Sequence, residues 1–347
     1  MRFVVLRFVF FIVMMCAIFG CGTFLQLQAQ DVSGVSSLTP SGNTRLSADG
    51  QTIADIVVGY DAIAAWVDVA ASKQPADKIA LFERLIVERY KSHCFTGPAL
   101  PDDDGQITGM VFGNPGAWDL AQVKKEIQAL QQNKKQVVEE IQRAMAESRG
   151  RLPAKTVPRV CVFYFQPDSP VRDRMHGVMA FTPSQFLMDL YVAPASGWIP
   201  WVGYNVAHEY HHTQWMARNP ERDSFKFRLL EYLVFEGRAD NFAFQTTGLR
   251  GDWSHALSAE QECTVFESIK PSLHVTGPIL PKVMFGWPGS GYPQWAGYTF
   301  GFGIVNSFLK LHPKEPVESW TDLAVDDLFI ASHYDPCAGN KTSHLRP

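Results

Sequence analysis

The sequence lacks an excess of charge of either sign, since 31 Lys and Arg residues stand against 35 Asp and Glu residues and the formal net charge is −4. No stretch collects basic residues with interleaved aromatic residues, a pattern typical of nucleic-acid-binding proteins. Nucleic acid is therefore excluded as a partner. The chain also has no Cys-x-x-Cys pair and no internal repeat, and the missing pair argues against a zinc site built from cysteines.

The N-terminal segment differs in composition from the rest of the chain. The run Phe8–Phe19 carries no charge, follows Arg7, and is too short to span a bilayer comfortably. We therefore interpret residues 1–30 as a signal peptide or a lipoprotein signal. A lipoprotein-like cleavage box before Cys21 would leave a lipid anchor on that residue, whereas cleavage at Ala29 would release a soluble protein. The expected location is periplasmic, outer-membrane-anchored as a lipoprotein, or secreted.

The remainder of the chain has the composition of a globular protein. Of its 347 residues, 46% are apolar and 12% are aromatic, which is ample material for a packed core. Four cysteines remain after the export signal, namely Cys94, Cys161, Cys263 and Cys337. In an oxidising compartment this even number predicts one or two disulfides, with the connectivity open.

Periodicity divides the chain after the signal into three regions. Residues 31–52 are rich in Ser, Gly, Thr and Asp, and predict a flexible spacer. Residues 53–150 predict a helical N-terminal region, with a helical hairpin from Asp55 onward and a long amphipathic helix from Leu120 to Met145. Residues 151–347 form the third region, which carries the residues suited to chemistry.

This third region predicts two strands followed by helices. The β-rich runs are Arg159–Gln166 and Gln185–Val192. Two helices follow, one from Pro200 through Trp215 and one from about Pro220 to Thr247, where Gly248 ends it. The rest of the region is expected to be loop-rich, with one further apolar helix over Phe300–Leu309.

The segment His208-Glu209-Tyr210-His211-His212 contains a His-Glu-x-x-His motif. On a helix, His208 and His212 lie about 6 Å apart along the axis and face the same way, so two imidazoles can bind one tetrahedral zinc ion. Glu209 projects to the side, where it would reach a water on the open metal position without being a ligand. The motif therefore predicts a zinc ion with Glu209 as a general base.

A third ligand is expected on the following helix. Glu236 lies in an apolar segment, and a buried carboxylate requires a partner. Zinc would be that partner; the alternative is a buried ion pair with Arg238 or Arg228. Asp240, one turn beyond Glu236, is the candidate that accepts a hydrogen bond from a ligand histidine, with a solvated helix residue as the alternative.

These residues resemble a family of bacterial predicted zinc-dependent proteases of the gluzincin type, the domain of unknown function 2268. The family's signature is HEYHH followed by EGxA, and this sequence reads HEYHH and EGRAD. A later Gly-Tyr motif is similar to Gly297–Phe302, so the resemblance covers roughly Val160 to Leu309. It implies an α+β, mostly helical, thermolysin-like catalytic core, with a small sheet packed on the active-site helix.

The resemblance also implies a zinc metallopeptidase that acts on a peptide or protein. Glu209 would take a proton from water, and Tyr298, placed by chain order and resemblance, would donate to the developing oxyanion unless it is a core tyrosine. An exposed strand, either Met179–Phe181 or Leu190–Val192, would hold an extended substrate unless both are core strands. Two other functions stay open: a zinc-stapled, non-catalytic module that binds peptide or glycan, and a non-peptidase metallohydrolase such as a cell-wall amidase.

Overall fold

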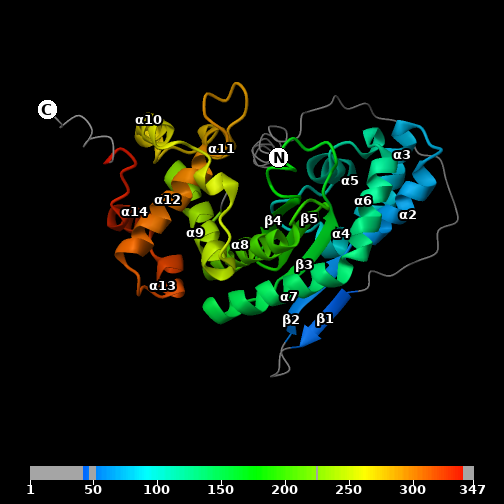
Figure 1. Cartoon of the computed structure of the whole chain (residues 1–347), viewed down its shortest axis with the longest axis horizontal. Helices are drawn as coiled ribbons and strands as arrows, with labels where there is room; N and C mark the ends of the chain where they lie inside the picture. The colour runs from blue at the N-terminus through cyan, green and yellow to red at the C-terminus, as the bar shows by residue number, and fades with distance from the viewer. Residues whose placement is uncertain (1–41, 47–51, 224–225, 339–347) are drawn as a thin grey trace. The chain divides into compact units, whose positions relative to one another are not determined.

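The computed structural model describes residues 42–46, 52–223 and 226–338 (Figure 1). The predicted export signal, including Cys21, lies outside these residues. The chain divides into two compact units. The sheet unit takes its described residues from 42–147 and 156–213, and the helical unit takes its own from 148–155 and 214–338. None of the helices in these ranges is long and apolar enough to cross a membrane.

A five-stranded mixed sheet forms the centre of the sheet unit, in the order β1-β2-β3-β5-β4. Strands β2, β3 and β5 are parallel, and the outer strands β1 and β4 are antiparallel to their neighbours. The strands are β1 (Gly42–Leu46), β2 (Thr52–Val58), β3 (Arg159–Tyr164), β4 (Val178–Ser184) and β5 (Leu187–Val192). With the helices around it, the sheet confirms the α+β class, whereas the thermolysin-like arrangement stays a prediction.

The sheet begins earlier in the chain than the sequence indicates. Strand β1 lies within the predicted spacer of residues 31–52, and Asp55–Val58, predicted as helix, belongs to strand β2. Strand β2 pairs in parallel with β3, with Asp55 opposite Arg159, and Arg159 Nε donates to Asp55 Oδ2 at 2.7 Å. Local periodicity missed β2 because its partner strand lies about a hundred residues further along the chain.

The helices between β2 and β3 agree with the predicted hairpin and with most of the predicted long helix. The long helix is divided at Asn133, whose backbone at φ −96° and ψ 4° leaves the helical region. Asp119 caps the first part by accepting hydrogen bonds from the backbone N–H of Ala121 and Gln122. The helices are α2 (Tyr60–Ala70), α3 (Pro75–Phe82), α4 (Arg89–Cys94), α5 (Asp104–Ile107), α6 (Leu120–Gln132) and α7 (Lys134–Arg151).

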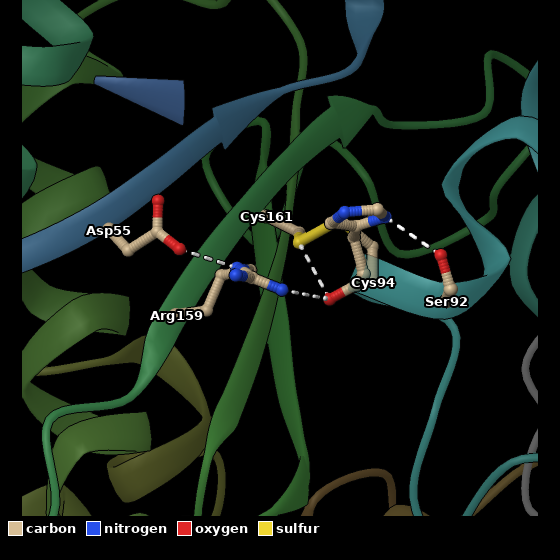
Figure 2. Close-up of a disulfide and its surroundings, with 6 residues drawn as sticks. Asp55, Ser92, Cys94, Arg159 and Cys161 are labelled. Atoms are coloured by element: carbon tan, nitrogen blue, oxygen red, sulfur yellow. Dashed lines mark hydrogen bonds and ion pairs between the residues drawn. A yellow bond between two sulfur atoms is a disulfide. The ribbon is translucent and has the colours of Figure 1, made fainter. Parts of the chain in front are cut away.

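Two disulfides form, which agrees with the predicted one or two and supplies the connectivity that the sequence left open. Cys94–Cys161 joins helix α4 to strand β3, and Cys263–Cys337 joins two segments of the helical unit. Figure 2 shows the first bond, with Arg159 beside it bridging the Asp55 carboxylate and, at 3.3 Å, the backbone oxygen of His93. Helix α4 is therefore bound to strand β3 by a covalent bond and a hydrogen bond, and the N-terminal helices belong to the same unit as the sheet.

The helical unit contains more helix than its proline-rich sequence indicates. Helix α9 (Leu229–Thr247) begins nine residues later than predicted and ends, as predicted, at Gly248, which adopts φ 75°. The other helices are α10 (Ala259–Ile269), α11 (Ile279–Phe285), α12 (Ala296–Leu311), α13 (Val317–Asp322) and α14 (Val325–Ser332). Of these, only α12 was predicted.

Helices α9 and α12 approach closely at two glycines. A Cβ built on Gly237 would lie 2.0 Å from the backbone oxygen of Gly301, and a Cβ on Gly301 would lie 2.2 Å from that of Leu233. Any side chain at either position would force the two backbones apart. The glycine of the EGRAD segment therefore serves packing between α9 and α12.

Candidate metal centre

Helix α8 (Ile199–Arg218) carries the His-Glu-x-x-His motif, on residues that belong to the sheet unit. His208 and His212 are buried, with side chains 8% and 4% exposed, and their Nε2 atoms lie 3.0 Å apart. Two nitrogens that bind one tetrahedral zinc ion at 2.0–2.1 Å would be separated by about 3.3 Å. The two rings thus converge at a separation that fits a single ion.

Glu209, on helix α8, is held in place by a hydrogen bond from strand β4. Its side chain is 4% exposed, and the Thr182 hydroxyl of β4 donates to Glu209 Oε2 at 2.8 Å. A hydrogen bond to a buried carboxylate fixes its orientation and offsets part of its desolvation cost. Sequence analysis did not identify Thr182, because no local pattern relates it to a helix 27 residues away.

Glu236 is buried on helix α9 of the helical unit, with 7% exposure. Neither arginine proposed as its ion-pair partner serves that role. Arg228 pairs with Glu231 and Asp326. Within the described part of the chain, Arg238 makes one hydrogen bond, to the backbone oxygen of Leu323. The alternative of a buried ion pair with either arginine is therefore wrong.

His208 and His212 of the sheet unit and Glu236 of the helical unit are all buried, and each offers one ligand atom. That the three hold one metal ion stays a prediction. One imidazole pair and one carboxylate form a donor set that zinc accepts. A second group, Glu267, Asp335 and Cys337, also offers three donor atoms. It does not suit a metal, because the Cys337 sulfur is bonded to Cys263.

Asp240 is fully buried, so the alternative of a solvated helix residue is wrong. Its Oδ1 accepts a hydrogen bond from Trp253 Nε1 at 3.0 Å, and its Oδ2 accepts one from Ser254 Oγ at 3.1 Å. These contacts fix the carboxylate on α9. That it also accepts from a ligand histidine stays a prediction.

Tyr298 lies in the first turn of α12 and is half-buried, with its ring centroid 5.9 Å from that of Phe285. The residue is therefore not a fully buried core tyrosine. Its proposed role as a hydrogen-bond donor to the developing oxyanion stays a prediction.

Asp189 is a buried acid that sequence analysis did not single out. It is fully buried in β5, opposite Cys161 of β3 and Phe181 of β4. Neither carboxyl oxygen has a hydrogen-bond partner among the residues that the structure describes. Burial raises the pKa of Asp189 well above its usual value, and the charge of Glu209 raises it further. A single Asp inside the apolar run Leu187–Val192 was the available signal.

We expect Asp189→Asn to stabilise the chain increasingly as pH rises. Above pH 3.8, the ordinary pKa of the group, the unfolded chain loses this proton and the folded chain keeps it. The free energy of unfolding of the wild type should therefore fall by up to about 1.4 kcal/mol per pH unit until the raised pKa is reached. Asn cannot ionise, so its variant lacks this slope.

Urea unfolding at pH 4, 5, 6 and 7 measures the difference between Asp189→Asn and wild type. Asp173→Asn, at an exposed position in the same unit, is the matched control and should follow the wild type. A difference between Asp189→Asn and wild type that stays constant with pH would contradict a raised pKa at Asp189.

Comparison with known protein families identifies the family to which the chain belongs. A family model described as a predicted Zn-dependent protease matches residues 137–329, which is more than half of the chain. The chain thus belongs to a class of predicted zinc-dependent proteases. Its family is the domain of unknown function 2268 (DUF2268), which confirms the resemblance of HEYHH and EGRAD. Comparison with curated proteins and with solved structures gives no match.

Proposed function

We propose that the chain is a zinc metallopeptidase, in which His208, His212 and Glu236 bind the metal and Glu209 is the general base. The observation that carries this proposal is the convergence of the two histidine Nε2 atoms at 3.0 Å on a buried helix. The neighbouring Glu209 carboxylate is oriented by Thr182. Membership of a family of predicted zinc-dependent proteases supports the same reading.

The chemistry divides between the metal and the chain's own residues. A zinc ion bound there supplies a Lewis acid that acidifies water and polarises a substrate carbonyl. Glu209 accepts the proton released by water and passes it to the leaving amine. Asp240 is proposed to orient a ligand histidine, and Tyr298 to donate a hydrogen bond to the oxyanion.

Substrate binding is proposed at the outer strand β4. Strand β5 lies between β3 and β4, so Leu190–Val192 has both edges paired and cannot accept a further strand. Met179–Phe181 belongs to β4, the last strand of the sheet, and β4 also carries Thr182. An extended peptide that pairs with β4 would therefore run past the strand that orients Glu209.

Export is proposed from the predicted N-terminal signal, with Cys21 as the site of a lipid anchor. The two disulfides support this proposal, because such bonds persist in oxidising compartments. The resulting location is periplasmic, outer-membrane-anchored or secreted.

Chelation tests the proposed function. We expect the purified chain to cleave casein, with cleavage lowered at least about a hundredfold by 1,10-phenanthroline and restored by added zinc, since the ion supplies several kcal/mol of transition-state stabilisation. Cleavage that the chelator leaves unchanged would contradict the proposal. A zinc-loaded chain that cuts no protein or peptide would instead favour the non-catalytic binding module or a metallohydrolase with a non-peptide substrate.

A further inference from the structure

Arg238, on helix α9, is a buried cation with few partners. The residue is 2% exposed, and among the described residues its one hydrogen bond is donated by Nη2 to the backbone oxygen of Leu323. A guanidinium carries five N–H donors. The Nε donor is buried, and no acceptor for it exists among the described protein atoms.

Among the described residues, no carboxylate lies within 4.0 Å of the Arg238 guanidinium. The carboxylate whose charge acts on Arg238 is Asp322, and its Oδ2 already pairs with Arg218 Nη1 at 3.2 Å. Fully buried arginines are almost always paired, because burying an isolated charge costs several kcal/mol. Arg238 therefore lacks the counter-charge that its burial requires.

The charges around Arg238 do not balance. The positive charge of Arg222 acts on Arg238, and Arg222 forms an ion pair with Glu231, with Nη2 and Oε1 2.6 Å apart. Arg228 pairs with Glu231 and with Asp326, the latter at 3.0 Å. This cluster of the helical unit thus holds four guanidinium groups and three carboxylates: Arg218, Arg222, Arg228 and Arg238 against Glu231, Asp322 and Asp326. One positive charge is left over, and it belongs to the most buried member.

We propose that Arg238 binds a small monovalent inorganic anion of the chloride type. An arginine does not lose its proton in proteins, so the charge must be compensated rather than removed. A single negative charge balances the cluster. Because Arg238 is only 2% exposed, it presents no surface to a peptide carboxylate or a lipid headgroup, which leaves a small ion as the counter-charge.

The anion would accept a hydrogen bond from Nε of Arg238, while Nη2 donates to the carbonyl of Leu323, which lies between α13 and α14. It would therefore stabilise the contact of α9 with the end of the helical unit. Arg238 leaves α9 about 200° from Glu236, since helix residues are spaced by roughly 100°. The anion site is thus separate from the proposed metal ligands and does not depend on the proposed function.

Thermal unfolding of the full chain in sodium chloride and in sodium gluconate, at equal ionic strength, tests this proposal. At a hundredfold excess over its dissociation constant, chloride should raise the melting temperature of the wild type by on the order of 5 °C. The shift should disappear in Arg238→Gln. It should persist in Arg143→Gln, which removes an exposed arginine whose partners are Glu140 and Glu147. Equal melting temperatures of the wild type in the two salts, or an equal shift in Arg238→Gln, would overturn the proposal.

Bromide supplies a second readout that does not depend on a folded variant. Crystals of the wild type grown in sodium bromide should show an anomalous scattering peak beside the Arg238 guanidinium. No bromide at this position would overturn the site.

Discussion

Glu209→Gln is expected to lower casein cleavage by a factor of roughly 10² to 10⁴, the usual contribution of a general base. The amide keeps the shape of the carboxylate and can still accept a hydrogen bond from the Thr182 hydroxyl, 2.8 Å away in the wild type. It cannot accept a proton from water. The variant should therefore fold and bind zinc as the wild type does, and the loss should appear in kcat.

Glu139→Gln is the matched control for this experiment. Glu139 is an exposed glutamate of the same unit, with its nearest cation, Lys135 Nζ, 3.8 Å away, so its loss should leave kcat and KM unchanged. Cleavage by Glu209→Gln at more than about a tenth of the wild-type rate would rule out Glu209 as the general base. Loss of zinc from this variant would instead assign it a role in metal binding.

Removal of the Cys94–Cys161 disulfide is expected to lower the free energy of unfolding of the sheet unit by about 4 kcal/mol. The two cysteines are separated by 67 residues, and a cross-link that closes a loop of this length restricts the unfolded chain by this amount in the chain-entropy account. Both sulfurs are fully buried, so alanine is the appropriate replacement. Urea unfolding under non-reducing conditions measures the change.

Comparison of the single variants with the double variant distinguishes the stability lost with the cross-link from the stability lost with side-chain packing. Cys94→Ala and Cys161→Ala each break the same bond, so each should show nearly the full loss, and the double variant should lose little more. Single losses that add up in the double variant would assign the effect to side-chain packing. A loss below about 1 kcal/mol in every variant would contradict the stabilising role of this bond.

The candidate metal ligands and the candidate general base of helix α8 could be predicted from sequence, because their relative positions are set within one short segment. His208, Glu209 and His212 lie within five residues of one helix, so the spacing of the motif determines their relative positions. Gly248 ended helix α9 as predicted for the same reason, since a positive φ at a helix end favours glycine. Strands β3 and β5 were found from their apolar, β-branched runs.

The features that sequence analysis missed depend on contacts between distant segments. Asp55–Val58 of strand β2 was predicted as helix, because the strand is defined by its pairing with β1 and with the distant β3. Gly237 packs against Gly301 of α12, about sixty residues further along the chain, and no local pattern indicates this contact. Thr182 binds Glu209 across 27 residues, and no local pattern indicates it. The loop-rich reading of the last third also missed α10, α11, α13 and α14, of which α11 and α13 begin directly after prolines.

The central claim is that two histidines and Glu236 bind one zinc ion, and elemental analysis of the purified chain tests it most directly. Wild type, Glu236→Ala and Glu231→Ala should be compared, because Glu231 lies on the same helix but pairs with Arg222 and Arg228. The account predicts one zinc per chain in the wild type and in Glu231→Ala, and a loss of zinc in Glu236→Ala, as expected when one of three protein ligands is removed. A wild type without zinc, or a Glu236→Ala variant that keeps it fully, would contradict the ligand assignment.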